Sequence, residues 1–421
     1  MSIKIRLTLM SFLQFFVWGA WMITIGVYWF QNKQWSGSEF GAIFSTLGIS
    51  SLFMPALTGI IADKWINVEF LYGILHILFG CTFLYLPYVD DPQTFFWVIL
   101  LAMIFYMPTI ALSNSIAYSL LKKKGYDVIK DFPPIRVWGT VGFVVAMWVT
   151  DLTGNKALTG QFYISAVAAI GLGIYAFTLP ACPPLRSNTE NASLSGRLGL
   201  NAFRLFRIPK MALFFIFSMF LGGALQLTNM YGDAYLSDFG NIPAYADSFV
   251  VRHSTIILSI SQISETVFIL AIPFFLRRFG IKQVMLISML AWVLRFGLLA
   301  YANPIDGVWM IILSCIVYGM AFDFFNISGS LFVETSTHPS IRSSAQGLFM
   351  MMTNGFGAIL GSFMSGFLIE RYFTEDSGRM MWQEIWISFA AYALVIAFLF
   401  SFLFKHRHEP ATSDEPATAK G

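Results

Sequence analysis

The feature that most constrains this chain is a series of long, mostly apolar segments that recurs from one end to the other. A helix that crosses the hydrocarbon core of a bilayer needs ~20 mostly apolar residues. The strands of a membrane β-barrel alternate in polarity over ~10 residues, and the segments here are too long and too continuously apolar for that. We therefore predict an all-α integral membrane protein with twelve transmembrane helices. The approximate spans are residues 7–30, 40–62, 70–88, 95–120, 137–152, 163–179, 211–235, 256–276, 284–302, 309–333, 348–369 and 385–404.

Composition agrees with a membrane protein. Of the 421 residues, 57% are hydrophobic and 12% are charged, whereas about a quarter of a soluble domain is charged. Cys81, Cys182 and Cys315 show no spacing of a disulfide framework, so no structural disulfide is predicted. Lys4 and Arg6 precede the first apolar segment as they would in a signal peptide. That segment is too long for such a peptide and lacks a small-residue cleavage site, so it is predicted to be the first membrane span.

The distribution of Lys and Arg predicts the orientation of the chain. Clusters of these residues lie near the N-terminus, in the loops that follow even-numbered segments, and after the last segment. The alternate loops are acidic or carry few charges. Because cytoplasmic loops carry the excess of Lys and Arg, both ends of the chain are predicted to be cytoplasmic.

The longest stretch between apolar segments divides the chain into two sets of six. The predicted organisation is an N-terminal six-helix bundle (1–179), a cytoplasmic central loop (180–210), a C-terminal six-helix bundle (211–404) and a cytoplasmic tail (405–421). Such an arrangement suggests two repeats around a site near the middle of the membrane. Gly59, Asp63 and Lys64 match the first part of the Gly-x-x-x-Asp-Arg/Lys gating-loop motif of the major facilitator superfamily, although its later Gly and basic residues are missing. The sequence therefore predicts the major facilitator fold with two six-helix halves.

One apolar segment, 309–333, contains a carboxylate near its middle. A charge at that depth costs ~3 kcal/mol on insertion scales, so Asp323 is expected to line a cavity or to hold a partner. Tyr318 and Phe322 are spaced i,i+4 and share one helix face. At about 100° per residue, Asp323 lies about 140° around the helix from Tyr318. This segment is a predicted wall of a small-molecule site.

Other polar residues within the predicted spans extend this candidate site. Arg136, Thr140 and Phe143 are spaced i, i+4 and i+7 and share one face, but Arg136 equally fits an arginine that snorkels at a cytoplasmic helix end. In the second half, an amide pair and an amide–acid pair are each spaced i,i+3 and suit a polar, uncharged ligand. The alternative is hydrogen bonding between helices, worth only ~0.6 kcal/mol on average in membranes. These pairs are Gln226 with Asn229 and Gln262 with Glu265.

Motifs for catalysis or metal binding are missing from the sequence. It contains no Gly-x-Ser-x-Gly, no His-Glu-x-x-His and no phosphate-binding loop. Its five histidines and three cysteines show no metal-ligand spacing. We therefore predict no enzyme, no cofactor and no metal. Without an ATP-binding loop, uphill transport would have to draw on an ion gradient.

Several longer runs of residues resemble one known family. The chain is similar, over nearly its whole length, to the nucleoside:proton symporters of the major facilitator superfamily, typified by the bacterial nucleoside permeases. The incomplete loop motif at Gly59 is the main departure. The runs that carry the resemblance are Phe-Met-Pro-Ala-Leu at 53–57, Asp-Phe-Pro-Pro-Ile-Arg at 131–136, Ser-Gln-Ile-Ser-Glu-Thr at 261–266, Tyr-Gly-Met-Ala-Phe-Asp-Phe-Phe-Asn-Ile-Ser-Gly-Ser at 318–330 and Met-Met-Thr-Asn-Gly-Phe-Gly at 351–357.

The resemblance implies a ligand and roles for the flagged residues. It implies a monomeric secondary active symporter of the bacterial inner membrane, embedded in the lipid bilayer, that imports a nucleoside of the uridine, cytidine or adenosine type together with a proton by alternating access. Nucleic acid is not an expected partner. The implied nucleoside contacts are Arg136, Thr140, Phe143, Gln226, Asn229, Gln262, Glu265, Tyr318 and Phe322.

Proton coupling is assigned to the membrane carboxylates. Burial disfavours the charged form of a carboxyl and a neighbouring arginine favours it, so Glu265 and Asp323 are the predicted coupling groups and Arg295 their predicted counter-ion. Two alternatives remain open at this point. One is a sugar–proton symporter or an uncoupled nucleoside facilitator on the same fold. The other is a membrane receptor or an embedded enzyme.

Overall fold

The computed structural model describes residues 2–184, 200–338 and 341–406. Within these ranges the chain is helical apart from its connecting loops and one isolated β-bridge between Thr374 and Met380. About half of the predicted central loop 180–210, residues 185–199, and nearly all of the predicted tail 405–421 lie outside the described residues. The predicted all-helical fold is confirmed for the part of the chain that the structure describes.

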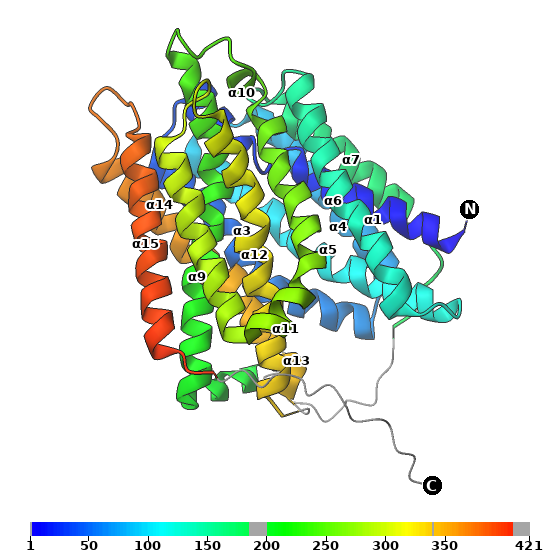
Figure 1. Ribbon diagram of the computed structural model, residues 1–421. Helices are drawn as coiled ribbons and strands as arrows, with labels where there is room; N and C mark the ends of the chain where they lie inside the picture. The colour runs from blue at the N-terminus through cyan, green and yellow to red at the C-terminus, as the bar shows by residue number, and fades with distance from the viewer. Residues whose placement is uncertain (1, 185–199, 339–340, 407–421) are drawn as a thin grey trace.

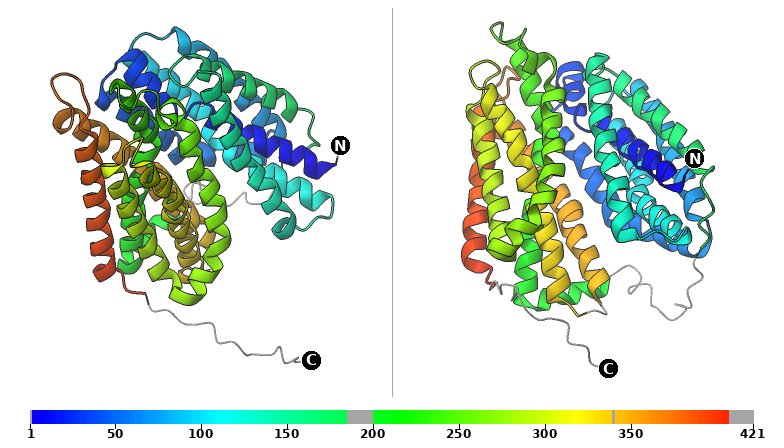
Figure 2. Two further views of the ribbon diagram at one scale, coloured as in Figure 1. Left: turned by 45° about the horizontal axis from the view of Figure 1, so that its top comes forward. Right: turned by 45° about the vertical axis from the view of Figure 1, so that its right-hand side comes forward.

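The helices gather into two groups along the chain (Figures 1 and 2). The first group consists of α1 (Ile3–Gly19), α2 (Ile25–Val27), the π-helix η1 (Tyr28–Lys33), α3 (Gly37–Lys64), α4 (Val68–Tyr85), the 3-10 helix η2 (Leu86–Tyr88), α5 (Pro92–Lys123), α6 (Val128–Leu152) and α7 (Gly160–Ala176). The second group consists of the 3-10 helix η3 (Leu200–Arg207), α9 (Pro209–Asp238), the 3-10 helix η4 (Phe239–Asn241), α10 (Phe249–Arg252), α11 (Ser254–Tyr301), α12 (Val308–Ser336), α13 (Arg342–Met350), the π-helix η6 (Met351–Gly357), α14 (Ala358–Tyr372) and α15 (Trp382–Leu403).

Nine helices in the described ranges are long and apolar enough to cross a membrane. They are the helical stretches 37–59, 68–88, 92–123, 130–152, 209–241, 254–301, 308–336, 345–372 and 382–403. The shorter apolar helix α7 adds 160–176. The chain is therefore a multi-pass membrane protein by helix length and composition.

Two predicted segments merge in the structure into one helix. The 48-residue α11 would be ~72 Å long if it were straight, more than twice the ~30 Å hydrocarbon core. At Gly280 the backbone has φ 76° and ψ 169°, which breaks the helix at a kink. Only glycine adopts such a conformation without a steric cost. The two limbs of α11, residues 254–279 and 281–301, correspond to the predicted segments 256–276 and 284–302.

The first predicted segment is, in contrast, divided. The α-helix α1 ends at Gly19, turns occupy residues 20–24, and the chain continues through α2 into η1. Some other helices begin with a capping side chain, as α1, α3, α5 and α10 do. At the start of α5, the Thr94 N–H donates to the Asp91 carboxylate at 2.7 Å, and this hydrogen bond lowers the pKa of Asp91. Acidic side chains at a helix N-terminus are stabilised in this way.

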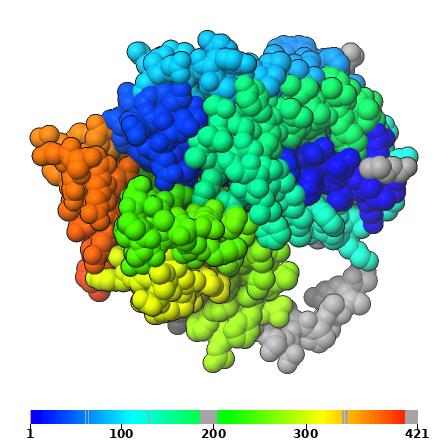
Figure 3. Space-filling model, turned by 90° about the horizontal axis from the view of Figure 1, so that it is seen from above, coloured from blue at the N-terminus to red at the C-terminus, as the bar shows by residue number. Residues whose placement is uncertain are grey.

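The two groups of helices contact each other through a small number of pairs. These pairs are α3 with α14 and η6, α6 with α11, and α2 with α9. At Gly41 on α3, an added Cβ atom would lie 2.4 Å from the Ser362 carbonyl oxygen on α14. Glycine is therefore what permits this close approach. Seen from above, green residues of the second group lie directly against blue and teal residues of the first (Figure 3).

The gating-loop motif lies at the end of α3. Gly59 is in the last turns of this helix, and a Cβ atom added there would meet no other heavy atom within 4 Å. The side chains of Asp63 and Lys64 lie outside the described part of the structure. The gating role of the motif stays a prediction.

Candidate functional site

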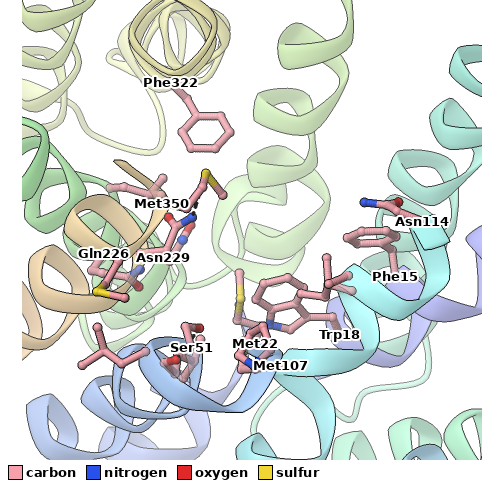
Figure 4. Close-up of a pocket in the computed structure, with 18 of the residues that line it drawn as sticks. Phe15, Trp18, Met22, Ser51, Met107, Asn114, Gln226, Asn229, Phe322 and Met350 are labelled. Carbon is pink, nitrogen blue, oxygen red and sulfur yellow. Dashed lines mark hydrogen bonds between the residues drawn. The ribbon is translucent and has the colours of Figure 1, made fainter. Parts of the chain in front are cut away.

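A cavity of about 830 Å³ lies between the two groups of helices. Small-molecule sites in proteins usually have volumes of roughly 300–1,000 Å³. Side chains of α1, α3, α5 and α6 line it from the first group, and side chains of α9, α11, α12, α13 and η6 line it from the second. Figure 4 shows these side chains converging from opposite sides. A ligand held here would touch both groups at once.

All nine predicted substrate positions line this one cavity. The helix α6 contributes three of them, and α9, the first limb of α11 and α12 contribute two each. Their roles in binding stay predictions, but the structure brings together residues that lie up to 186 positions apart in the sequence, since 322 − 136 = 186. The nine are Arg136, Thr140, Phe143, Gln226, Asn229, Gln262, Glu265, Tyr318 and Phe322.

Aromatic rings form both walls of the cavity. On α12, the rings of Tyr318 and Phe322 stack with centroids 6.0 Å apart and planes 8° apart. On α1, the rings of Phe15 and Trp18 are stacked at 6.3 Å. The Arg136 guanidinium lies 4.0 Å from the centre of the Phe15 ring, a cation–π contact. A flat ligand would find a stacking surface on either side.

The amide side chains near the cavity have unused hydrogen-bonding capacity. Gln226 is 7% exposed, and its Oε1 has no hydrogen-bond partner among the described residues. The same holds for Oε1 of Gln262. Buried polar atoms are nearly always satisfied in folded proteins. Amides in this state are therefore suited to a polar ligand or to water in the cavity.

The two predicted coupling carboxylates differ in position. Glu265 lines the cavity, whereas Asp323 is 4% exposed and does not. The Asp323 Oδ2 has no hydrogen-bond partner among the described residues. Glu265 interacts electrostatically with Asp323 on one side and with Arg136 on the other. The three groups form a series that runs from the first group of helices, through the cavity wall, to the interior of the second.

Arg295 is fully buried but makes no ion pair with a carboxylate among the described residues. One of its terminal nitrogens donates to the Ser314 carbonyl oxygen at 2.7 Å and to Ser261 Oγ at 3.4 Å. Its guanidinium lies 4.6 Å from the centre of the Tyr318 ring. In this conformation Arg295 therefore supports the aromatic wall, and its role as counter-ion stays a prediction.

Several cavity residues were not singled out from the sequence. Phe15 and Trp18 come from α1 and Met22 from the turn that follows it, and no periodic polar signal marked them. Asn114 on α5 and Asn354 on η6 are polar but isolated. Asn354 belongs to the quoted run 351–357, which was the one available signal. Met350, just before this run, and Met351, its first residue, also line the cavity.

The described residues contain no group of three or more His, Cys, Asp or Glu side chains that could hold a metal ion. What the cavity offers is stacking, hydrogen bonding and the carboxyl of Glu265, with the buried Asp323 behind it. These suit the reversible binding of a flat, polar molecule together with a proton.

The helical membrane fold and the cavity between its two groups define a small-molecule transporter. A family model described as "Nucleoside H+ symporter" matches residues 1–409, and the chain belongs to this family. The prediction of proton-coupled nucleoside import is therefore confirmed, as is the prediction that the chain is not an enzyme.

Particular relatives agree with this assignment. The chain is 50% identical to the nucleoside permease NupG of Escherichia coli (strain K12) over 409 residues, which are 97% of each sequence. It is 51% identical to the xanthosine permease of the same organism over 411 residues, 97% of this chain and 98% of the relative. The crystal structure of the nucleoside transporter NupG has a TM-score of 0.90 with this chain at 50% identity, covering 97% of this chain and 100% of that one.

Proposed function

We propose that a nucleoside of the uridine, cytidine or adenosine type binds in the cavity between two six-helix halves of a major facilitator fold. The first half comprises the helices within 3–176, with α1 to η1 as one span. The second comprises those within 209–403, with each limb of α11 as a span and α13 to α14 as another. The observation that supports this proposal is the convergence of all nine predicted contacts on one cavity.

The chemistry of the walls matches that of a nucleoside. The base stacks against the rings of Tyr318 and Phe322. The ribose hydroxyls and the polar edge of the base are recognised by the amides of α9 and α11 and by Arg136. Because each chain has a complete cavity, a monomer in the lipid bilayer suffices for transport.

In the proposed orientation the chain lies in the inner membrane of a bacterial cell with both termini inside, and the cavity opens toward the cytoplasm. The cavity extends to Phe203 on η3 and to Gly347 on α13, beside the basic segment around Arg204 and Arg207. Basic segments of this kind are cytoplasmic. At the opposite end the two halves are in contact.

Glu265 and Asp323 couple the proton to the nucleoside. Arg136 lies on the first half and both carboxyls on the second, so rocking of the halves changes the distance between them. With Arg136 near, the charged form of Glu265 is favoured; with Arg136 distant, the protonated form is favoured. A proton taken up from the outside is then released inside after the rocking motion.

Uptake into proteoliposomes tests this proposal. With an inward proton gradient, labelled uridine is expected to accumulate unmodified above its external concentration, and a protonophore is expected to abolish this accumulation. Unlabelled cytidine and adenosine should compete, whereas hexoses should not. Accumulation that survives the protonophore, or competition by hexoses but not by nucleosides, would contradict the proposal. Binding without accumulation would indicate a receptor instead.

A further inference from the structure

The run at 351–357 has a backbone conformation that sets it apart from its neighbours. These seven residues form the π-helix η6, whereas α13 before it and α14 after it are α-helices. A π-helical segment accommodates extra backbone within a helix and re-aims the side chains that it carries, and such segments occur often at functional sites. The residue of interest in η6 is Asn354.

The backbone of η6 is fixed by close contacts on both sides. A Cβ atom added to Gly222 on α9 would lie 2.0 Å from the Thr353 carbonyl oxygen, and one added to Gly48 on α3 would lie 2.7 Å from that of Gly355. Two glycines thus allow backbone-to-backbone packing immediately before and after Asn354. The position of its Cα atom is therefore determined by one helix from each half.

The side chain of Asn354 is only partly buried and lines the main cavity. It also lines a small adjoining pocket of about 20 Å³ together with Leu225 and Phe322, so it lies near the aromatic wall. Its Nδ2 is 3.9 Å from Sδ of Met350, which Figure 4 shows beside Gln226 and Asn229.

The amide of Asn354 retains its main hydrogen-bonding capacity. A side-chain amide has two donor hydrogens and an acceptor oxygen, whereas a thioether sulfur is a weak acceptor. The contact with Met350 is the one side-chain partner that the amide has among the described residues. A donor and an acceptor are therefore both available beside the ring of Phe322.

We propose that Asn354 is a specificity-determining residue whose amide hydrogen-bonds the edge of the nucleobase stacked beside Phe322. This inference rests on the proposed function. Uracil presents O4 next to N3–H, and adenine presents N1 next to its N6 amino group. An asparagine amide pairs with such adjacent acceptor and donor atoms, and rotating it by 180° reverses their order. Asn354 thus requires a base edge whose adjacent donor and acceptor are both free. It does not distinguish pyrimidine from purine nucleosides that have such an edge.

The test measures how uridine and 3-methyluridine compete for uptake in proteoliposomes. Methylation at N3 removes the uracil donor and adds bulk at the same edge. In the wild type, 3-methyluridine is expected to bind roughly tenfold more weakly than uridine, the loss that an unmatched hydrogen-bonding edge produces. In Asn354→Leu, uridine weakens by a similar factor and the ratio between the two ligands falls close to one.

Controls separate this role from a structural one. Asn326→Leu alters an amide that lines the small pocket but not the main cavity, and it is expected to keep the wild-type ratio. If Asn354→Leu is not monodisperse in detergent, Asn354→Ala removes the same amide without added volume and must give the same collapsed ratio. The ratio between uridine and 2′-deoxyuridine should be unchanged in both.

Three results would overturn the inference. The first is an unchanged ratio of uridine to 3-methyluridine in the Asn354 variants. The second is loss of discrimination against 2′-deoxyuridine, rather than against 3-methyluridine, in those variants. The third is collapse of the ratio of uridine to 3-methyluridine in Asn326→Leu. All three presuppose that the wild type takes up uridine. If it does not, the proposed function fails, which is a separate result.

Discussion

At the scale of single residues, the carboxyls of Glu265 on α11 and Asp323 on α12 differ in their position relative to the cavity. Glu265 faces the cavity, whereas Asp323 is buried with an oxygen that has no partner among the described residues. Such an oxygen is costly to leave ionised in the membrane interior. Asp323 is therefore suited to carry a proton without touching a ligand. Glu265 lies where it can contact a ligand in the cavity and interact electrostatically with Asp323.

Replacing Asp323 with Asn should uncouple transport. The amide keeps the shape of the side chain but cannot take up and release a proton. Uridine is expected to equilibrate across the membrane without accumulating, while exchange of internal for external uridine persists. Uptake and counterflow assays in proteoliposomes measure the two quantities. If the Asp323→Asn protein still concentrates uridine, Asp323 is not a coupling group.

The position of Arg295 allows its two possible roles to be separated. Its guanidinium covers the Tyr318 ring, and a cation–π contact in a desolvated place contributes on the order of 2 kcal/mol. Lysine keeps the charge but lacks the planar group that stacks on a ring. We expect Arg295→Lys to raise KM for uridine roughly fivefold, as a partial loss of that contact implies, and to leave accumulation intact.

The same variant bears on the counter-ion prediction. If Arg295 acts mainly through its charge, Arg295→Lys should transport with an unchanged KM and Arg295→Met should lose accumulation as Asp323→Asn does. A normal KM in the lysine variant would therefore contradict support of the aromatic wall.

At the scale of helices, the regular α-helical geometry is interrupted where the two groups meet or where a ligand would bind. The first predicted span is interrupted after Gly19, and η6 is π-helical between α13 and α14, where it faces α3. Interrupted helices in transporters commonly border the substrate site. The kink at Gly280 has a different effect, because it divides one 48-residue helix into two limbs.

The contact between α3 and α14 provides a test at this scale. A valine at Gly41 would place side-chain atoms where the Ser362 carbonyl oxygen lies. Overpacking of this kind costs roughly 1–3 kcal/mol. We expect Gly41→Val to lower the melting temperature of the purified protein and its rate of uridine uptake. The matched control is Gly171→Val on α7, where an added Cβ meets no atom within 4 Å; equal effects of the two would contradict this account.

At the scale of the whole molecule, polar contacts join the two groups at the end opposite η3. Lys156, between α6 and α7, donates to the carbonyl oxygens of Val251 and Arg252 at 2.9 and 3.1 Å. Nearby, His253 contacts the buried Asp151 carboxylate at 2.8 Å. These bonds would have to break before the cavity opened to that side. They stabilise the conformation seen here.

Removing the Lys156 ammonium should therefore shift the conformational equilibrium. Hydrogen bonds to a charged group contribute about 1.5–3 kcal/mol, so Lys156→Met is expected to increase the population with this end open. Spin labels at the exposed positions Leu158 and Ala244, in a variant with its three cysteines replaced by serine, would report a longer distance between the groups.

Lys33→Met is the matched control for that experiment. Lys33 contacts the Val89 carbonyl oxygen and Asp90, both in its own group, so its loss changes the charge but not the contacts between groups. If the distance distribution is the same in Lys156→Met as in the wild type, the contacts of Lys156 do not hold this end closed.

Much of the site was predictable because its signals are local. Helical geometry alone places Arg136 with Phe143, and Tyr318 with Phe322, on common faces. The cost of burying a charge in lipid singles out Asp323 and Glu265 from their neighbours. Asn354 and Trp18 gave no such signal. Asn354 lies beside Thr353 in a run without polar periodicity, and Trp18 is one of several aromatic residues in an apolar segment.

The sequence by itself determined that the chain is a helical membrane protein and which residues of a helix share a face. These follow from the thickness of a bilayer and the pitch of a helix, which do not depend on distant contacts. Only the tertiary structure decided which faces meet around one cavity, that Arg295 lies against Tyr318 rather than a carboxylate, and that Asn354 on η6 lines this cavity. Those outcomes depend on packing between residues that are far apart in the chain, and no local pattern encodes them.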